Sequence, residues 1–393
     1  MGSPVAGVRL RPTDLVAADL PLGSAWPALL EAVWTAGAAL LPIDSRLPSP
    51  ASAALVARAR PTVMAGASGA RRLRDGAPAQ QGDGVVVATS GSTGEPRLAV
   101  LSRDALAAAV AASAEALGAT AADRWLLCLP PAHIGGLLVL FRGLFAGNPA
   151  IVLPKFTVEA VAAERRARYI SLVPTLVRRL LDRGADLAHL RAVLVGGDAL
   201  DPGLAGAARA AGVRLVHTYG QTQSCGGVVY DGVPLPGVDV RVAAGGEVQL
   251  RGPTLMSGYR LDPVASAGAF TGDGWLRTGD GGTIAATGTL VVRGRLGDVI
   301  VTGGEKVWPA EVEDVLRDHP AIADAAVLGR PDPEWGQRVV AVVVAAPGAA
   351  PLTLAAVRGW VEERLAGYQA PRELRTVESL PRTAAGKLRR AAL

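Results

Sequence analysis

The sequence predicts an α/β protein with a large N-terminal domain of helix-covered β-sheets and a smaller α+β C-terminal domain. Its 393 residues, half of them hydrophobic, exceed one ordinary domain and supply apolar surface for more than one core. Through residues 24–217, short apolar runs alternate with helical patterns, which is typical of parallel sheets covered by helices. Residues 238–292 change to short alternating strands with frequent glycines, which favours antiparallel pairing.

The helix over residues 103–117 has the clearest predicted boundaries. Ser102 can cap its first turn, its Ala-rich sequence has high helix propensity, and Gly118 can end it. The same reasoning predicts helices over residues 26–36, 50–59, 309–318 and 353–365, and strands over residues 38–43, 85–88, 125–129, 150–153, 170–173, 192–195, 213–217, 323–328 and 338–345.

A glycine-containing interruption, Gly294 to Gly297, marks the predicted domain boundary. We expect residues 1–296 to form the large domain and residues 297–393 the small one, which ends in a basic tail.

Composition excludes several classes of protein. The net charge is +5, but 40 basic and 35 acidic residues are interspersed, so no nucleic-acid track is predicted. The two cysteines, Cys128 and Cys225, lie far apart, which supports neither a disulfide framework nor a zinc site. The N-terminus has no secretory pattern, and prolines, His133 and Arg142 break the richest apolar stretch. We therefore expect a cytoplasmic protein without a membrane span.

The strongest chemical signal is the loop that follows the predicted strand at residues 85–88. Glycines let backbone N–H groups approach an anion, hydroxyls donate further bonds, and a closing cation can pair with phosphate oxygens. The loop lacks the GK[ST] ending of a Walker motif, and by itself a Gly/Ser turn fits equally well. The candidate phosphate ligands are Thr89, Ser90, Gly91, Ser92, Thr93, Gly94 and Arg97.

This loop resembles the phosphate loop of the adenylate-forming superfamily, which includes acyl-CoA synthetases, luciferases and peptide-synthetase adenylation domains. Residues 129–137 and 228–234 further resemble the actinobacterial succinylbenzoate-CoA ligase branch, and ligases of natural-product pathways that make diterpenoid acids are similar. Other family landmarks follow in the expected order: residues 196–199, 217–223, 275–280, 294–295, 303–313 and 381–387.

The resemblance implies a mobile C-terminal domain and a reaction in two steps. It also places the hinge of that domain at Gly297, usually Asp or Lys in the family, and glycine's broad conformational freedom suits such a rotation. A carboxylate attacks the α-phosphate of ATP to give an acyl-adenylate and pyrophosphate, and the thiol of CoA then displaces AMP. The implied cofactors are ATP or AMP, or a preformed acyl-adenylate, together with CoA. No metal-ligating residue is predicted, and the use of Mg²⁺ is left open.

The resemblance also implies residue roles on the nucleotide side. Tyr219 would stack on adenine with Gly220 leaving room beside it, and Asp280 and Arg295 would bind the ribose hydroxyls. Taken singly, a core tyrosine and surface charges are the ordinary alternatives. The remaining residues expected around the nucleotide are Gly197, Asp198, Ala199, His217 and Thr218.

Further roles concern the reacting groups. Thr222 would donate to the α-phosphate, and Lys387 would neutralise charge as the carboxylate attacks. His133, in an apolar sequence setting, would lie near the acyl pocket, although a core histidine fits as well. Gly303 and Gly304 would line a tunnel for the pantetheine arm of CoA, with a plain turn as the alternative.

Two residues depart from the family pattern. The usual lysine of the phosphate loop is Arg97, which is bulkier and planar. The glutamate that helps to hold Mg²⁺ on ATP is Gln223, and a neutral amide is a poorer ligand for a hard cation than a carboxylate. These departures predict a CoA ligase with impaired adenylation that mainly thioesterifies an adenylate, and a partner ligase is the candidate source of that adenylate. An ordinary two-step ligase and a noncatalytic adenylate-binding protein are the alternatives.

The predicted substrate is a bulky, apolar carboxylic acid. This expectation depends on small residues that would leave space in the acyl pocket, and on a short N-terminal region compared with most family members. The small residues are Gly135, Gly136, Gly226 and Gly227.

Overall fold

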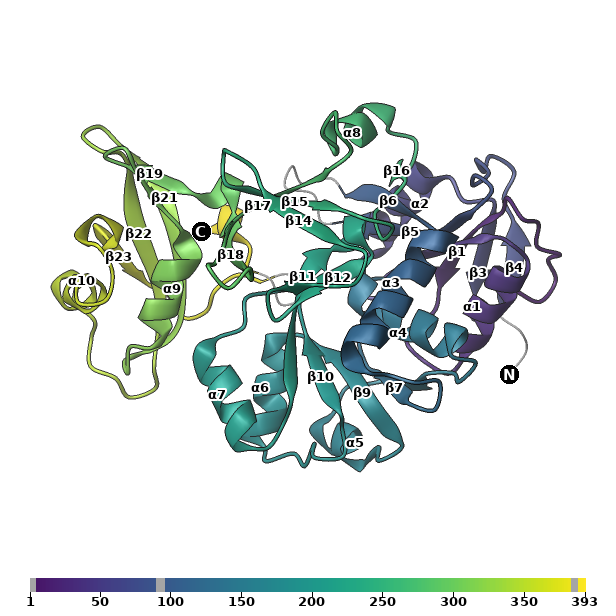
Figure 1. The fold of residues 1–393 in the computed structure, drawn as a ribbon, viewed down its shortest axis with the longest axis horizontal. Coiled ribbons are helices and arrows are strands. Elements are labelled where there is room, and N and C mark those ends of the chain that lie inside the picture. Colours follow the sequence, from purple (N-terminus) through teal and green to yellow (C-terminus); the bar gives the residue numbers. More distant parts are fainter. Residues whose placement is uncertain (1–4, 90–95, 383–387) are drawn as a thin grey trace. The chain divides into compact units, whose positions relative to one another are not determined.

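The computed structural model describes residues 5–89, 96–382 and 388–393 (Figure 1). The chain forms two compact units. The first unit contains the residues up to 240 together with 250–277, and the second contains residues 241–249 and 278–393. Within the described ranges, no helix is long and apolar enough to cross a membrane.

The first unit contains two seven-stranded sheets. One has the strand order β16-β6-β5-β2-β1-β3-β4, and its centre is parallel because β1 pairs with β2 and β3 in the same direction. The β5–β6, β6–β16 and β3–β4 pairs are antiparallel. The strands of this sheet are β1 (Leu15–Asp19), β2 (Ala39–Pro42), β3 (Val63–Gly66), β4 (Gly69–Arg72), β5 (Asp83–Thr89), β6 (Arg97–Ser102) and β16 (Gly258–Tyr259).

The second sheet has the order β13-β12-β11-β10-β9-β7-β8. Strands β7 to β11 are parallel, and β12 turns back antiparallel to β11. The expectation of parallel sheets is therefore correct at the centres of both sheets. It is wrong at both edges of the first sheet and at the β12–β13 edge of the second. Its strands are β7 (Arg124–Leu127), β8 (Ile151–Val152), β9 (Ala167–Leu172), β10 (Ala192–Val195), β11 (Leu215–Gln221), β12 (Gly226–Tyr230) and β13 (Val233–Pro234).

Two helices join these sheets. Helix α3 (Arg103–Leu117) contacts β5 and β6 of one sheet and β12 of the other, and α4 (Ile134–Phe145) contacts α3, β7 and β12. The predicted ends of α3 are confirmed, because Ser102 Oγ accepts from Ala105 N at 3.1 Å and Gly118 has a φ of 62°. The other helices are α1 (Ala25–Thr35), α2 (Ser49–Ala59), α5 (Val158–Ala163), α6 (Pro174–Asp182), α7 (Pro202–Ala210) and α8 (Pro263–Gly268).

The second unit is built on a five-stranded sheet with the order β20-β19-β22-β21, and β23 pairs with β22. Its core includes Val312, Leu316, Ala341 and Val357, all fully buried. A second, four-stranded sheet has the order β14-β15-β17-β18, and the chain passes between the units along three of its strands. The elements are β14 (Asp239–Val242), β15 (Glu247–Arg251), β17 (Leu276–Ile284), β18 (Leu290–Arg295), β19 (Ile300–Thr302), β20 (Glu305–Val307), α9 (Pro309–Arg317), β21 (Ile322–Asp332), β22 (Gly336–Ala345), α10 (Leu354–Glu362) and β23 (Glu373–Thr376).

The predicted hinge lies in a short 3₁₀ turn, Leu296–Asp298. A Cβ atom added to Gly297 would meet no atom within 4 Å, so space does not require glycine there. The domain boundary at residues 296 and 297, and the rotation about it, stay predictions.

A pair of substitutions at Gly297 tests the hinge. Gly297→Ala has room and should leave both half-reactions near the original rate, whereas Gly297→Pro fixes φ and should impair one half-reaction selectively. We expect thioester formation from a preformed adenylate to fall by at least about tenfold in the proline variant. Equal rates for the proline and alanine variants would remove Gly297 as the hinge.

Candidate functional site

The predicted phosphate loop is the connection of a β-hairpin. Thr89 at the end of β5 pairs with Arg97 at the start of β6, and the Thr89 hydroxyl donates to the Arg97 carbonyl oxygen at 3.2 Å. The two ends of the loop are therefore side by side. The other candidate ligands lie outside the described residues: Ser90, Gly91, Ser92, Thr93 and Gly94.

A 3₁₀ turn, Thr222–Ser224, presents Thr222 and Gln223. Its shape depends on the fully buried Ser224, whose hydroxyl oxygen accepts from Gln221 N at 3.0 Å. The same hydroxyl donates to the Gly226 carbonyl oxygen at 2.9 Å. Thr222 and Gln223 are both half-buried at this turn, so their side chains remain partly open to a ligand.

Tyr259 connects the two residues that depart from the family pattern. Gln223 Nε2 donates to the Tyr259 hydroxyl at 2.9 Å. The guanidinium carbon of Arg97 lies 5.5 Å from the centre of the Tyr259 ring, within cation–π range. No local pattern in the sequence indicates Tyr259, because 36 residues separate it from Gln223 and its place beside β6 depends on the pairing of β16 with that strand.

Tyr219 and Gly220 lie on β11, the strand at which the second sheet changes from parallel to antiparallel pairing. Tyr219 is half-buried on β11 and pairs with Val229. Gly220 was expected to leave room beside adenine, but a Cβ atom there would lie 2.0 Å from the Gly226 carbonyl oxygen. The close approach of β12 therefore requires this glycine by itself.

Thr218 lies where β10 and β11 approach each other closely. Its hydroxyl donates to the Val195 carbonyl oxygen at 3.2 Å, and a Cβ atom on Gly196 would lie 2.5 Å from the Thr218 hydroxyl oxygen. These contacts give Thr218 a packing role between β10 and β11. Its predicted contact with a nucleotide stays a prediction.

His217 interacts with the loop after β10 through a hydrogen bond with the Asp198 backbone. Burial lowers the pKa of His217, while the Asp231 carboxylate and a hydrogen bond with the Asp198 backbone act in the opposite direction. Gly197 has a φ of 87°, which favours glycine. Gly197, Asp198 and Ala199 are exposed, as contact with a ligand would require.

The two predicted ribose ligands form an ion pair in the second unit. Asp280 and Arg295 are register partners on β17 and β18, and Asp280 Oδ1 lies 3.1 Å from Arg295 Nε. Arg295 also donates to the Thr278 carbonyl oxygen at 2.9 Å. The Asp280 side chain is largely buried and that of Arg295 is half-exposed. Their predicted contact with the ribose stays a prediction.

Gly303 and Gly304 form the two-residue turn of the β19–β20 hairpin, with φ values of 58° and 87°. Positive φ at both positions is the reason that glycine is favoured there. A Cβ atom on Gly303 would lie 2.8 Å from the Trp335 ring, whereas Gly304 is open. Their predicted contact with pantetheine stays a prediction.

Lys387 lies outside the described residues, but both flanks of its loop are anchored in the second unit. Arg382 pairs with Leu388 in a β-bridge and forms an ion pair with Asp324 at 2.6 Å. Arg390 binds the buried carboxylate of Glu313 and lies 3.3 Å from Asp298 Oδ2, beside the predicted hinge.

The expected surroundings of His133 are wrong. Its side chain is 45% exposed and lies 3.4 Å from Asp44 Oδ2 and 3.2 Å from Arg46 Nη2, so it is neither apolar in setting nor a core histidine. The bond from Arg46 lowers the pKa of Asp44. His133 occupies the N-cap position of α4 without a side-chain capping hydrogen bond, and its predicted place near the acyl pocket stays a prediction.

At three of the four glycines expected to leave space in the acyl pocket, other protein atoms occupy the place that a side chain would take. A Cβ atom on Gly136 would lie 2.5 Å from the Pro130 carbonyl oxygen, and one on Gly226 would lie 2.8 Å from Leu138 Cδ1. Gly227 faces Thr218 at the same distance, and only Gly135 has ordinary clearance. These residues therefore permit close packing, and they do not argue for a large acyl pocket.

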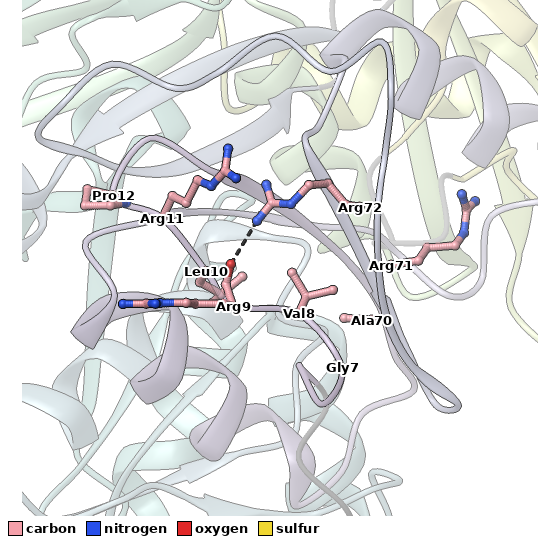
Figure 2. A pocket seen from close by; sticks show the side chains of 9 residues that line it. All are labelled: Gly7, Val8, Arg9, Leu10, Arg11, Pro12, Ala70, Arg71 and Arg72. Atoms are coloured by element: carbon pink, nitrogen blue, oxygen red, sulfur yellow. Dashed lines mark hydrogen bonds between the residues drawn. The ribbon is translucent and has the colours of Figure 1, made fainter.

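One pocket, with a volume of about 800 Å³, is lined by none of the predicted site residues (Figure 2). Arginines line it, but the side chains of Arg9 and Arg71 extend in opposite directions. Arg72 is already bound to Asp14 at 2.7 Å and to the Arg9 carbonyl oxygen at 2.8 Å. The arginines therefore do not converge on one anion.

Within the described part of the chain, no three His, Cys, Asp or Glu side chains gather as a metal site would require. The two cysteines are buried free thiols. Burial raises the pKa of Cys128 to about 12 and also raises that of Cys225, so both are protonated at neutral pH.

Comparison with known proteins decides the family. Residues 75–260 match the family model of the AMP-binding enzyme, and residues 311–387 match that of the AMP-binding enzyme C-terminal domain. A probable 2-succinylbenzoate–CoA ligase of Mycobacterium tuberculosis is 44% identical over 372 residues, which cover 91% of this chain and 95% of that protein. This chain belongs to the adenylate-forming acyl-CoA ligases. It is an AMP-forming acid–thiol ligase that binds an adenine nucleotide and acts on a carboxylic acid.

Two further relatives support this family. The o-succinylbenzoate CoA synthetase of Bacillus subtilis, solved with its acyl-adenylate intermediate, matches this ligase with a TM-score of 0.87 and 27% identity. The match covers 97% of this chain and 88% of that one. An indoleacetate–CoA ligase of Aromatoleum aromaticum is 38% identical over 77% of this chain and 65% of its own length.

Removal of the Asp280 carboxylate should weaken nucleotide binding. A hydrogen bond to a charged group contributes about 1.5–3 kcal/mol, so Asp280→Ala should lower AMP affinity by about tenfold or more. Calorimetry with AMP would measure this. Glu373→Ala is the matched control, because Glu373 is also paired with arginines, Arg338 and Arg375, but belongs to no predicted site. Equal affinity in the two variants would exclude Asp280 from nucleotide binding.

Burial of His217 should make stability depend on pH. Below about pH 6.5 the unfolded histidine takes up a proton that the native residue resists, so the free energy of unfolding falls as pH falls. Urea unfolding between pH 5.5 and 7.5 would measure the slope, and His217→Asn should reduce it. Burial also lowers the pKa of His189, so His189→Asn supplies the second comparison. A slope that is unchanged in the His217 variant would contradict the assignment.

Proposed function

We propose that this ligase forms an acyl-CoA thioester mainly from an acyl-adenylate, and that its own adenylation step is slow. The observation that carries the proposal is the neutral amide of Gln223 on the turn Thr222–Ser224, at the position where the family pattern has a glutamate. The amide is engaged with Tyr259 through Nε2, which leaves one uncharged oxygen as the ligand that this side chain can offer.

The charge requirements of the two steps support this division. Adenylation brings a carboxylate to the polyanionic triphosphate and depends on Mg²⁺ and cationic side chains to offset the repulsion. Loss of a carboxylate weakens the hold on a hard cation, because Mg²⁺ prefers charged oxygen ligands. Thioester formation attacks a carbonyl that is already activated and requires no metal, so Gln223 should affect it little.

The residues that would serve the steps follow from the family resemblance. Thr222 would contact the α-phosphate, Lys387 would offset charge during adenylation, and Asp280 with Arg295 would hold the ribose. Gly303 and Gly304 would border the pantetheine arm of CoA. Thr89 and Arg97 would bind phosphate oxygens from the two adjacent ends of the hairpin loop.

A bulky acid with an aromatic ring is the proposed substrate. The names of the relatives support it, because two of them are ligases of 2-succinylbenzoate and indoleacetate. A partner ligase that supplies the adenylate would complete the sequence of reactions. The same names favour a second candidate, a complete two-step ATP-dependent ligase that tolerates Gln223.

Gln223→Glu distinguishes these candidates. Restoring the carboxylate should increase the rate of pyrophosphate release on the order of 10²-fold, which corresponds to about 2.7 kcal/mol of transition-state stabilisation. Thioester formation from preformed adenylate should change less than about twofold. Release of pyrophosphate would be measured with 2-succinylbenzoate, indoleacetate and benzoate as the acids.

Two comparisons make the result decisive. Arg97→Lys, alone and with Gln223→Glu, tests whether guanidinium geometry adds to the defect. Gln249→Glu is the matched control, because it adds the same charge at a buried glutamine that hydrogen-bonds with Glu247 and Arg241, outside the predicted site. Rapid pyrophosphate release from the unsubstituted ligase would overturn the proposal and establish the two-step enzyme.

A further inference from the structure

Both departures from the family pattern contact one side chain, Tyr259. We propose that Tyr259 is a positioning residue for the adenylation half-reaction: its hydroxyl orients the side chain at position 223, and its ring orients Arg97. This inference rests on the proposed function, since it concerns the same phosphate site.

The backbone of Tyr259 is fixed on two sides. Strand β16 pairs with β6, where Tyr259 lies opposite Ala99, and Tyr259 N donates to Ser266 Oγ at 2.7 Å. Gly258, with a φ of 147°, lets Ser266 approach, because a Cβ atom at Gly258 would lie 2.9 Å from the Ser266 hydroxyl oxygen. The half-buried phenol therefore extends from a rigid base.

The phenol hydroxyl can hold either side chain at position 223. It accepts from Gln223 Nε2, and this leaves Gln223 Oε1 without a hydrogen-bond partner among the described residues and free to act as an acceptor. A hydroxyl can also donate, so the same contact would serve the carboxylate of a glutamate. Tyr259 thus holds one polar atom of residue 223 and leaves an oxygen of the same side chain to accept from a ligand in both cases.

The ring explains the acceptance of arginine in place of lysine at position 97. Arg97 is exposed and forms no ion pair with any carboxylate in the described ranges. A planar guanidinium interacts with an aromatic face better than a compact, strongly hydrated ammonium does. The Tyr259 ring is therefore the contact that limits where the Arg97 cation can lie.

A double-mutant cycle between Tyr259 and Gln223 tests the inference. Tyr259→Phe removes the hydroxyl but keeps the ring, and Gln223→Ala removes its partner. We expect Tyr259→Phe to raise the Mg²⁺ concentration that half-maximally supports ATP binding by about threefold in the unsubstituted ligase. In a Gln223→Glu background the increase should be about tenfold, and in a Gln223→Ala background the hydroxyl should have no effect.

The ring is tested separately. Tyr259→Leu should weaken ATP binding more than Tyr259→Phe does, and this extra loss should disappear in an Arg97→Ala background. Tyr368→Phe, at an exposed tyrosine of the second unit, is the control for loss of a phenol hydroxyl. Thermal unfolding and thioester formation from benzoyl-adenylate would verify that each variant is folded.

Calorimetry with ATP at a series of MgCl₂ concentrations gives the main measurement, and pyrophosphate release gives the second. Losses from Tyr259→Phe that are equal in the glutamine, glutamate and alanine backgrounds would overturn the inference, since they would show a merely structural role. Rapid pyrophosphate release from the unsubstituted ligase would overturn only the slow-adenylation proposal, because the ATP-binding cycle is measured independently of turnover.

Discussion

Antiparallel pairing of β16 with β6 is the contact on which the candidate phosphate site of the first unit depends. The residues on either side of this two-residue strand extend the attachment: Ser257 N donates to the Val100 carbonyl oxygen at 2.9 Å, and Arg260 N donates to that of Leu98 at 2.8 Å. Met256 N donates to the Gln223 carbonyl oxygen at 2.7 Å. One short segment therefore connects the β5–β6 hairpin, which borders the predicted phosphate loop, to the turn that carries Thr222 and Gln223.

Arg260 strengthens this attachment by satisfying backbone carbonyls instead of a carboxylate. Its guanidinium donates to Ala59 O at 2.7 Å and also binds the carbonyl oxygen of Ala77, in the chain that leads from α2 to β5. Burial lowers the pKa of this arginine, while the charge of Asp83 acts in the opposite direction. Buried polar groups are stable when each has a partner, and here the partners come from distant parts of the sequence.

In the second unit, strand register and a buried carboxylate fix the positions of the charged side chains. Register on adjacent strands sets Asp280 beside Arg295, and the buried carboxylate of Glu313 receives Arg390 and Val327 N at 2.7 Å. A buried carboxylate with several donors is held firmly because its removal from water must be offset by hydrogen bonds. The chain that follows the loop of Lys387 is thereby fixed to the core of this unit through a few charged contacts.

The sequence by itself determined what local rules control. Capping and propensity set the ends of α3, the apolar runs located most strands, and the order of motifs indicated the family, the candidate nucleotide residues and the two departures at Arg97 and Gln223. These features depend on residues close together in the chain or on patterns that survive in one sequence.

Only the tertiary structure decided contacts between distant segments. The exposed setting of His133 beside Asp44, the filled space around Gly136 and Gly226, and the position of Tyr259 all depend on which strands and helices become neighbours. A glycine in a sequence does not reveal whether its missing side chain makes room for a ligand or for another backbone. Close packing settles that question, because interiors leave few voids and the nearest chain occupies the space.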